Sequence, residues 1–282
     1  MAPLLLSDKN GGSPFVLEPT GERMVPESAD MFTFWEHVYR YAFACRFVRG
    51  KRVLDIACGE GYGSAALQKS GAASVIGVDV SESTCAHVRN KYGLDAKPGT
   101  AEQIPLPDNS IDVVVSFETI EHLPNPCRFL DESVRVLAPG GRLVISTPNK
   151  EIYSARLGAR NRYHCSEMTQ EEFASALRAR FHDAHFYTQR PYSAAWWSPR
   201  TLVCESTPWR HIRGFHRLRQ AVQRRVFPEA VSDPTAEQRA STVDVILEVA
   251  GSRRRLLNQY VVRSRRGWHR EQSVYIVATA VR

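Results

Sequence analysis

The stretch that decides the fold reads Val53-Leu54-Asp55-Ile56-Ala57-Cys58-Gly59-Glu60-Gly61-Tyr62-Gly63. A short apolar run, residues 53–57, leads into a loop with three glycines, which predicts a buried strand followed by a turn and a helix. Glycine lets the backbone approach a ligand closely because it carries no Cβ. Open α/β sheets bind their ligands beside the carboxyl ends of the strands, where the strand order reverses. This stretch therefore predicts the ligand-binding end of such a sheet.

The segments around this stretch alternate between helix-like and strand-like patterns. Apolar residues recur at helical spacing over 31–48, and Gly50 ends that helix. The other expected strands are residues 73–78, 111–116, 142–146, 184–188 and 273–278, and the other expected helices are residues 64–69, 81–92, 126–137 and 169–181. This alternation predicts an α/β fold with a parallel sheet and helices on both faces.

The pattern divides the chain into four parts. Residues 1–30 carry glycines and prolines with little periodicity and are expected to form an N-terminal arm. Residues 31–190 form the core, residues 191–270 a basic helical insertion before the last strand, and residues 271–282 that strand. We expect the insertion to cover the site.

Positive charge is concentrated in the insertion. The chain has a net charge of +7, and residues 193–268 alone contain 14 arginines, no lysine and six acidic residues. A basic region on a near-neutral body favours an anionic partner: a nucleotide, a phosphate, an acidic lipid surface or a nucleic acid. A solvated basic surface without a partner is the alternative.

The spacing from the glycine loop to Asp79 fits a dinucleotide as well as SAM, and Ser64 and Asp55 distinguish between these nucleotide ligands. Asp79 closes the second strand, where its carboxylate can accept hydrogen bonds from ribose hydroxyls. A dinucleotide loop, G-x-G-x-x-G, requires glycine at position 64, but Ser64 stands there. Asp55 would repel a pyrophosphate, whereas it suits the cationic methionine end of S-adenosylmethionine (SAM). The pattern therefore favours SAM over a dinucleotide.

Three segments carry a family resemblance. The pattern Val53-Leu54-Asp55-x-x-x-Gly59-x-Gly61 resembles the first signature of class I SAM-dependent methyltransferases. Residues 105–114, PLPDNSIDVV, resemble their fourth-strand signature, and residues 135–143, RVLAPGGRL, resemble the one before their fifth strand. All occur in the expected order within residues 51–149. The resemblance implies a Rossmann-like class I methyltransferase sheet.

The resemblance also implies a set of cofactor contacts that runs from the methionine end of SAM to its adenine. The set comprises Ala57, Gly59 and Gly61 at the methionine part, Asp79 at the ribose, Val80 against the adenine, Ala101 and Glu102 at the adenine edge, and Phe117 with Glu118 beside the sulfonium. Thr100 stands where many relatives carry Asp, which leaves open the group that holds the adenine amine.

Two N-terminal motifs resemble a subgroup of bacterial methyltransferases, many of which modify sugars or natural products. They are residues 20–23, TGER, and the pattern Glu36-His37-x-x-Arg40-Tyr41. The resemblance implies that the first helix closes over SAM, with Arg40 or Tyr41 near its carboxylate. The alternative is an exposed arginine and a core tyrosine.

Candidate catalytic residues follow the fourth strand. Glu118, Glu121 and His122 lie at the carboxyl edge of the sheet, and a histidine there can act as a base near neutral pH. Their E-x-x-E-H spacing resembles ubiquinone-pathway O-methyltransferases, which implies that these three residues hold a divalent cation such as Mg²⁺. Alternatively, Glu121 and His122 cap and orient the next helix. His164 is the second candidate base, and a local hydrogen bond within its loop is the alternative role.

Several classes of protein are excluded or disfavoured. No stretch of 18 apolar residues appears, and Leu4, Leu5 and Leu6 are too few for a signal peptide, so no transmembrane segment and a cytoplasmic location are expected. Six cysteines form no C-x-x-C pair, which disfavours a zinc ribbon. No RNA-binding module is recognisable, so a nucleic-acid partner is disfavoured.

These observations predict a SAM-dependent O-methyltransferase. Its expected acceptor is a small hydroxylated molecule, a sugar or a glycosylated natural product, with an anionic group that the arginines recognise. The alternatives are an N-methyltransferase of a small amine, an RNA methyltransferase, and a SAM-binding module without catalysis.

Overall fold

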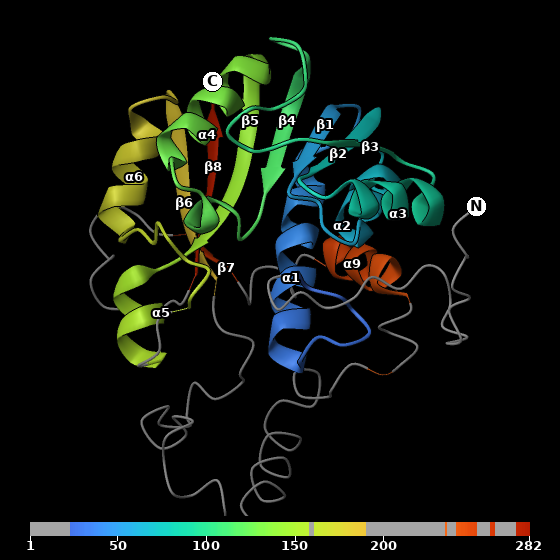
Figure 1. Ribbon diagram of the computed structural model, residues 1–282, viewed down its shortest axis with the longest axis horizontal. Helices are drawn as coiled ribbons and strands as arrows, with labels where there is room; N and C mark the ends of the chain where they lie inside the picture. Colours follow the sequence, from blue (N-terminus) through green and yellow to red (C-terminus); the bar gives the residue numbers. More distant parts are fainter. Residues whose placement is uncertain (1–22, 158–160, 190–234, 236–240, 253–259, 263–274) are drawn as a thin grey trace, which may run out of the picture.

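A mixed sheet organises the molecule. The computed structural model describes residues 23–157, 161–189, 235, 241–252, 260–262 and 275–282. In this part of the chain eight strands pair in the order β3-β2-β1-β4-β5-β8-β6-β7 (Figure 1). The strands are β1 (Arg52–Ile56), β2 (Ser74–Asp79), β3 (Asp95–Pro98), β4 (Ile111–Ser116), β5 (Leu137–Pro148), β6 (Asp183–Gln189), β7 (Tyr260–Val262) and β8 (Tyr275–Val281).

The strand order reverses between β1 and β4. β1 pairs in parallel with β2 on one side and with β4 on the other, and the chain makes β2 and β3 before it crosses over to β4. The loops after β1 and β4 therefore diverge at the carboxyl edge and leave room for a ligand. In Figure 1 the arrowheads of β4 and β5 point toward the side of the molecule where α1 and α5 lie.

The expectation of a parallel sheet is confirmed for β1 to β5 and was wrong at one edge. β8 runs antiparallel between β5 and β6, and β7 runs antiparallel to β6. An antiparallel strand needs no crossover helix, so the last strand can return between two parallel neighbours. The short strand β3 and the helix α5 were not predicted.

Helices cover both faces, as expected. They are α1 (Met31–Ala44), α2 (Tyr62–Lys69), α3 (Glu82–Tyr92), α4 (Pro126–Val136), α5 (Lys150–Leu157), α6 (Gln170–Arg178) and α9 (Thr242–Gly251), with short 3₁₀ helices η1 (Cys45–Phe47) and η2 (Ile120–His122). One apolar cluster joins α1, α2 and α9 to one face of the sheet, and a second joins α4 and α6 to the other. None of the helices in this part of the chain has both the length and the apolar composition needed to cross a bilayer.

Local signals set the helix boundaries. The side chain of Ser81 accepts a hydrogen bond from the backbone N–H of Thr84 and caps α3. Thr169 and Glu172 form the expected capping box at the start of α6.

Helix α9 lies in the stretch that the sequence assigned to the insertion, yet it belongs to the core. Its residues Val245, Ile246 and Val249 are buried in the same cluster as α1 and α2. An apolar stripe at helical spacing buries against other helices, which explains this placement. Most of the predicted insertion and residues 1–22 of the predicted arm lie outside the described residues, and so does the prediction that the insertion covers the site.

Candidate active site

The glycine loop after β1 is held between two helices. Ala57, Gly59 and Gly61 all have positive φ angles, 58°, 54° and 94°. A Cβ at Gly61 would lie 2.7 Å from Cγ2 of Val88 on α3, and a Cβ at Gly63 would lie 2.0 Å from the ring of Tyr41 on α1. Positions 61 and 63 therefore require glycine because neighbouring side chains come too close for any other residue.

Asp55 is a buried carboxyl group at the start of this loop. It has no exposed surface, and it accepts hydrogen bonds from Ser64 Oγ at 2.6 Å and from Tyr41 Oη at 3.2 Å. Burial raises the pKa of Asp55 to about 7, although both hydroxyls oppose the shift, and the nearby Asp79 adds to it. A cationic ligand beside Asp55 would favour its ionised form.

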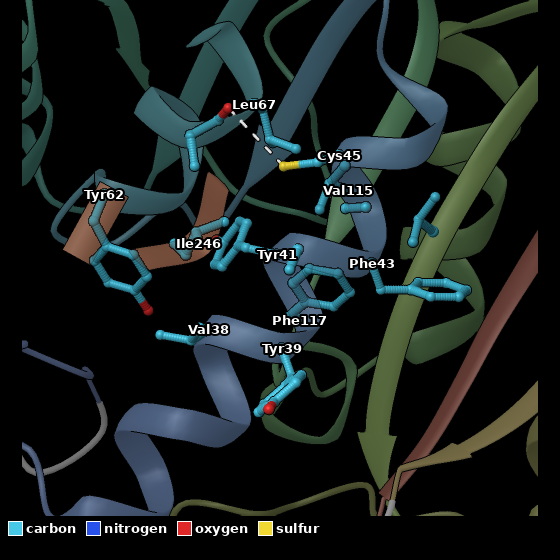
Figure 2. Close-up of a cluster of buried hydrophobic side chains, with 14 of the residues drawn as sticks. Val38, Tyr39, Tyr41, Phe43, Cys45, Tyr62, Leu67, Val115, Phe117 and Ile246 are labelled. Atoms are coloured by element: carbon cyan, nitrogen blue, oxygen red, sulfur yellow. Dashed lines mark hydrogen bonds between the residues drawn. The ribbon is translucent and has the colours of Figure 1, made fainter. Parts of the chain in front are cut away.

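Tyr41 joins α1 to the loop. It is 5% exposed and packs edge-on against Tyr62 and Phe117, with ring centroids 5.5 and 5.1 Å apart (Figure 2). Figure 2 shows these rings within the cluster between α1 and the sheet. Tyr41 is thus a core residue, as the alternative reading of the sequence proposed, and its hydroxyl contacts Asp55.

Asp79 stands at the end of β2 with its carboxylate already oriented. Its oxygens accept hydrogen bonds from the backbone N–H of Gly59 at 3.1 Å and of Ser81 at 3.0 Å. Next to it, Val80 is 75% exposed, and no other large hydrophobic residue of the described chain is classed as exposed. An oriented carboxylate beside an open apolar side chain suits a ribose with its adjoining base.

Ala101 and Glu102, predicted at the adenine edge, lie on the loop after β3. Ala101 is buried at 6% exposure. The Glu102 carboxylate accepts a hydrogen bond from the backbone N–H of Asn125 at 2.7 Å, and its carbonyl accepts one from Arg128 Nε at 2.8 Å. Glu102 therefore fixes the start of α4 beside the predicted adenine edge.

Glu118 follows β4 in a strained conformation. Its φ angle is 51°, which is unfavourable for a residue with a side chain. Ser146 on β5 donates its hydroxyl to Glu118 Oε1 at 2.6 Å, and Arg40 Nη1 lies 3.6 Å from the same oxygen. Partners on two other elements thus hold this carboxylate at the carboxyl edge.

Arg40 is not exposed, so that reading of the sequence was wrong. It is 1% exposed, its Nη1 donates to Gln189 Oε1 at 3.1 Å, and its guanidinium stacks on Tyr275 at 4.6 Å. Its neighbour Glu36 is buried as well, and burial raises the pKa of Glu36 to about 7 against the opposing charge of Arg40. Arg40 thereby links α1 to β4, β6 and β8.

The two candidate histidines meet at this edge. Their rings pack edge-on with centroids 4.8 Å apart, because the backbone N–H groups of Cys165 and Ser166 both donate to the carbonyl of Glu121 and join the two loops. Glu121 and His122 do not cap the next helix: Asn125 caps α4. That alternative for the pair was wrong.

The hydrogen bonds assign a proton to each histidine. His122 Nδ1 lies 3.2 Å from the carbonyl oxygen of Tyr163. A carbonyl only accepts, so Nδ1 carries a proton and, in the neutral imidazole, Nε2 has the lone pair. Nε2 lies 3.9 Å from Glu121 Oε1, and the His122 side chain is 25% exposed.

His164 is more tightly enclosed. The side-chain oxygen of Asn161 accepts from the N–H of Tyr163, so the Asn161 amide nitrogen is a donor, and it lies 3.0 Å from His164 Nε2. Nδ1 then donates to Glu167 Oε1 at 2.6 Å. Both bonds stay within the loop, as the alternative reading of His164 proposed.

The cation set implied by the E-x-x-E-H spacing does not form. Glu121, His122 and His164 each offer one ligand atom within 4.8 Å of the others, and Glu118 is not among them. Mg²⁺ prefers oxygen ligands, and two of these three groups are imidazoles. Both nitrogens of His164 already have partners. The residues therefore do not fit an Mg²⁺ site.

The structure places the predicted site residues at the carboxyl ends of β1, β2 and β4, on the loop that follows β3, or on α1, whereas His164 lies between α5 and α6. The sequence missed Arg23, Ser146, Asn161, Glu167, Gln189 and Tyr275. Ser146 could have been found from its position near the end of the fifth strand. Arg23 belongs to the motif at residues 20–23, although no role was assigned to it, and the remaining four carry no local signal.

Comparisons with known proteins agree with this arrangement. Residues 54–145 match the family model described as a methyltransferase domain. A probable S-adenosylmethionine-dependent methyltransferase from Mycolicibacterium smegmatis is 40% identical over 175 residues, 61% of this chain and 68% of the relative. A phthiotriol/phenolphthiotriol dimycocerosates methyltransferase from Mycobacterium tuberculosis is 38% identical over 109 residues, 36% of this chain and 40% of that protein.

Solved structures share the fold. A SAM-dependent methyltransferase from Thermotoga maritima, described as a possible histamine N-methyltransferase, superposes with a TM-score of 0.52 at 18% identity, over 89% of this chain and 94% of the other. The glycine loop, the oriented Asp79 and the strand order agree with these matches. The chain belongs to the class I SAM-dependent methyltransferases.

Proposed function

We propose that this enzyme transfers the methyl group of SAM to a hydroxyl of a small acceptor, a sugar or a glycosylated natural product, and that His122 is the general base. The observation that carries the proposal is the 3.2 Å contact between His122 Nδ1 and the carbonyl of Tyr163, which puts the lone pair of the neutral ring on Nε2. The loop that bears His122 directly follows β4, next to the predicted cofactor residues. The relative from M. tuberculosis acts on an acceptor that is a triol by name, which supports a hydroxyl.

Methyl transfer requires the protein to align the acceptor and to remove its proton. SAM, when bound, supplies a methyl group on a cationic sulfur, so the protein need only align the acceptor oxygen and take its proton. Alignment can supply about 7–11 kcal/mol of the barrier. His122 Nε2 takes the proton as the oxygen–methyl bond forms and the sulfur–methyl bond breaks. A positioned base contributes about 10²–10⁴-fold.

The carboxyl group of Glu121 stabilises the positive charge that forms on His122. Burial, with the nearby charge of Glu118, raises the pKa of Glu121 well above its usual range. An imidazolium 3.9 Å away favours the ionised carboxylate and is stabilised by it. This proton transfer requires no divalent cation, and we expect chelation with EDTA to leave turnover unchanged.

The acceptor is proposed to be anionic. The 14 arginines of residues 193–268 support this, because a guanidinium holds a phosphate with paired hydrogen bonds. A nucleotide diphosphate on a sugar is an acceptor of this kind.

An acceptor screen with methyl-labelled SAM tests the proposal. Sugar nucleotides, neutral glycosides, amines and RNA are incubated with the enzyme, and mass spectrometry locates the label. We expect label on an oxygen of a sugar nucleotide. Label on nitrogen, or tight RNA binding that weakens steeply with salt, would overturn the assignment.

The base is tested with a matched pair of histidine variants. We expect His122→Ala to lower kcat by about 10²–10⁴-fold while SAM affinity stays within about twofold. His185→Ala is the control, because His185 lies on β6 with a 57% exposed side chain and pairs with Asp183. Wild-type turnover in the His122 variant would dismiss the base.

A further inference from the structure

A short segment before α1 lies over the candidate cofactor site. We call residues 23–30 the strap. Met24 and Val25 are 7% and 3% exposed, and Met24 belongs to the apolar cluster of α1. A turn closes the segment, since the N–H of Ala29 donates to the carbonyl of Val25 at 2.9 Å. The strap is thus anchored in the core and does not hang from the helix.

The first residue of the strap contacts two parts of the site. The stem of Arg23 covers Gly59: a Cβ at Gly59 would lie 3.5 Å from Arg23 Cγ and 3.9 Å from Cδ. The guanidinium reaches onward to Asp79, with Nη2 3.9 Å from Oδ1. Both side chains are mostly buried, at 17% and 9% exposure. One side chain therefore spans the loop at the methionine end and the carboxylate at the ribose end.

A second contact ties the strap to the glycine loop from the other side. Glu27 Oε1 lies 3.8 Å from Lys91 Nζ on α3, and Lys91 also pairs with Glu60, the residue between the two glycines. Glu60 has further partners on α3, His87 at 3.0 Å and Tyr92 at 2.7 Å. The loop is therefore braced by α3 and, through Lys91, by the strap.

We propose that Arg23 is a positioning residue for the ribose of SAM. A carboxylate in a largely buried place binds hydroxyl groups well only when it is ionised and fixed in direction. Two backbone N–H groups fix the direction of Asp79, and the guanidinium of Arg23 lies 3.9 Å from one of its oxygens. Arg23 thus acts on the ribose hydroxyls through Asp79. The inference depends on SAM binding by the family and not on the proposed acceptor.

The test is a double-mutant cycle that needs no acceptor. The Kd of S-adenosylhomocysteine is measured by calorimetry for wild type, Arg23→Ala, Asp79→Asn and the double variant. We expect Arg23→Ala to raise Kd about tenfold, the scale of one charge-assisted contact. In the Asp79→Asn background, Arg23→Ala should raise Kd by less than about twofold, because residue 79 then has no carboxylate for Arg23 to position.

A ligand change and two further variants complete the test. When the ligand is the 2′-deoxy analogue, Arg23→Ala should raise Kd much less than it does for S-adenosylhomocysteine. Arg52→Ala is the control, because it breaks a comparable pair with Asp112 at the amino end of β1, and Kd should not change. Arg23→Lys keeps the charge and should raise Kd only about threefold. If Arg23→Ala does not fold, the lysine variant replaces it in the cycle.

Three results would overturn the inference. An unchanged Kd in folded Arg23→Ala would show that the pair does not serve the ligand. A lower Kd would show that Arg23 competes with the ribose. An equal loss in the Asp79→Asn background would show that Arg23 acts only through the stability of the loop.

Discussion

The buried carboxyl group of Asp55 should make SAM binding depend on pH. Burial raises the pKa of Asp55 to about 7, so near neutral pH the unliganded enzyme holds this group only partly ionised. SAM carries a positive sulfur and a positive ammonium group, which the ionised carboxylate binds better than the protonated one. Binding is therefore coupled to release of a proton from Asp55.

The size of the effect follows from that pKa. At one pH unit below the pKa of Asp55, this group is ionised in about one tenth of the enzyme molecules. For each further pH unit the ionised fraction, and with it the affinity for SAM, falls about tenfold, which is about 1.4 kcal/mol. Between pH 7.5 and 5.5 the apparent Kd should rise about 25-fold. The range stays below pH 7.7, because the α-amino group of the ligand titrates at about 7.7–8.0.

Calorimetry across this range decides the matter. We expect Asp55→Asn to bind weakly and without this slope. Asp112→Asn, which changes a carboxylate at the other end of the sheet, should bind like wild type. A flat wild-type profile, or an equal slope in Asp55→Asn, would refute the reasoning.

Folding stability gives a second readout with a defined sign. The pKa of Asp55 in the folded protein lies above its value of 3.8 in an ordinary environment. The folded state therefore binds the proton more tightly, and stability falls as pH rises from about 4 to 7, then stays level. Thermal unfolding without ligand should show Asp55→Asn gaining on wild type at pH 8 by at most about 4 kcal/mol. No gain at pH 8 relative to pH 5 would contradict the burial argument.

Two further predictions follow from the site and its packing. Calorimetry should show that Asp79→Ala weakens the binding of SAM by about 1–3 kcal/mol, as expected for a lost charged hydrogen-bond partner. Wild type should not bind NADH. Unchanged SAM affinity in Asp79→Ala would contradict the assignment of Asp79 to the ribose. Gly63→Ala should lower stability by about 1–3 kcal/mol because the new methyl group meets the Tyr41 ring, whereas Gly251→Ala, where nothing lies within 4 Å, should not; equal melting temperatures for both variants would contradict the packing.

Patterns along the chain were enough to predict the centre of the sheet. The expected strands 53–57 and 111–116 correspond to β1 and β4 because both are buried apolar runs bounded by turns. β3 was missed because its sequence, Asp-Ala-Lys-Pro, has neither apolar alternation nor β-branched residues. The antiparallel direction of β8 was missed because the pattern of apolar residues in a strand does not show whether it pairs parallel or antiparallel with its neighbours.

The geometry of the glycine loop and Asp79 was predictable, whereas the contacts of Arg40 and of the two histidines were less so, for one physical reason. The glycine loop and Asp79 carry their geometry in local sequence, through positive φ angles and strand ends. Arg40 contacts Gln189, which lies 149 residues further along the chain, and no local pattern encodes such a contact. His164 meets His122 only because two backbone hydrogen bonds to Glu121 join their loops.

The first helix couples the two halves of the reaction through adjacent residues. Tyr41 donates its hydroxyl to Asp55 at the predicted methionine end of SAM, and Arg40 pairs with Glu118 on the loop that also bears His122. Consecutive side chains on a helix point about 100° apart, so one helix can contact both places at once. A shift of α1 that breaks one contact must strain the other. Any displacement of α1 would therefore change the contacts of Asp55 and of Glu118 together, and in this way α1 connects the loop after β1 to the loop after β4.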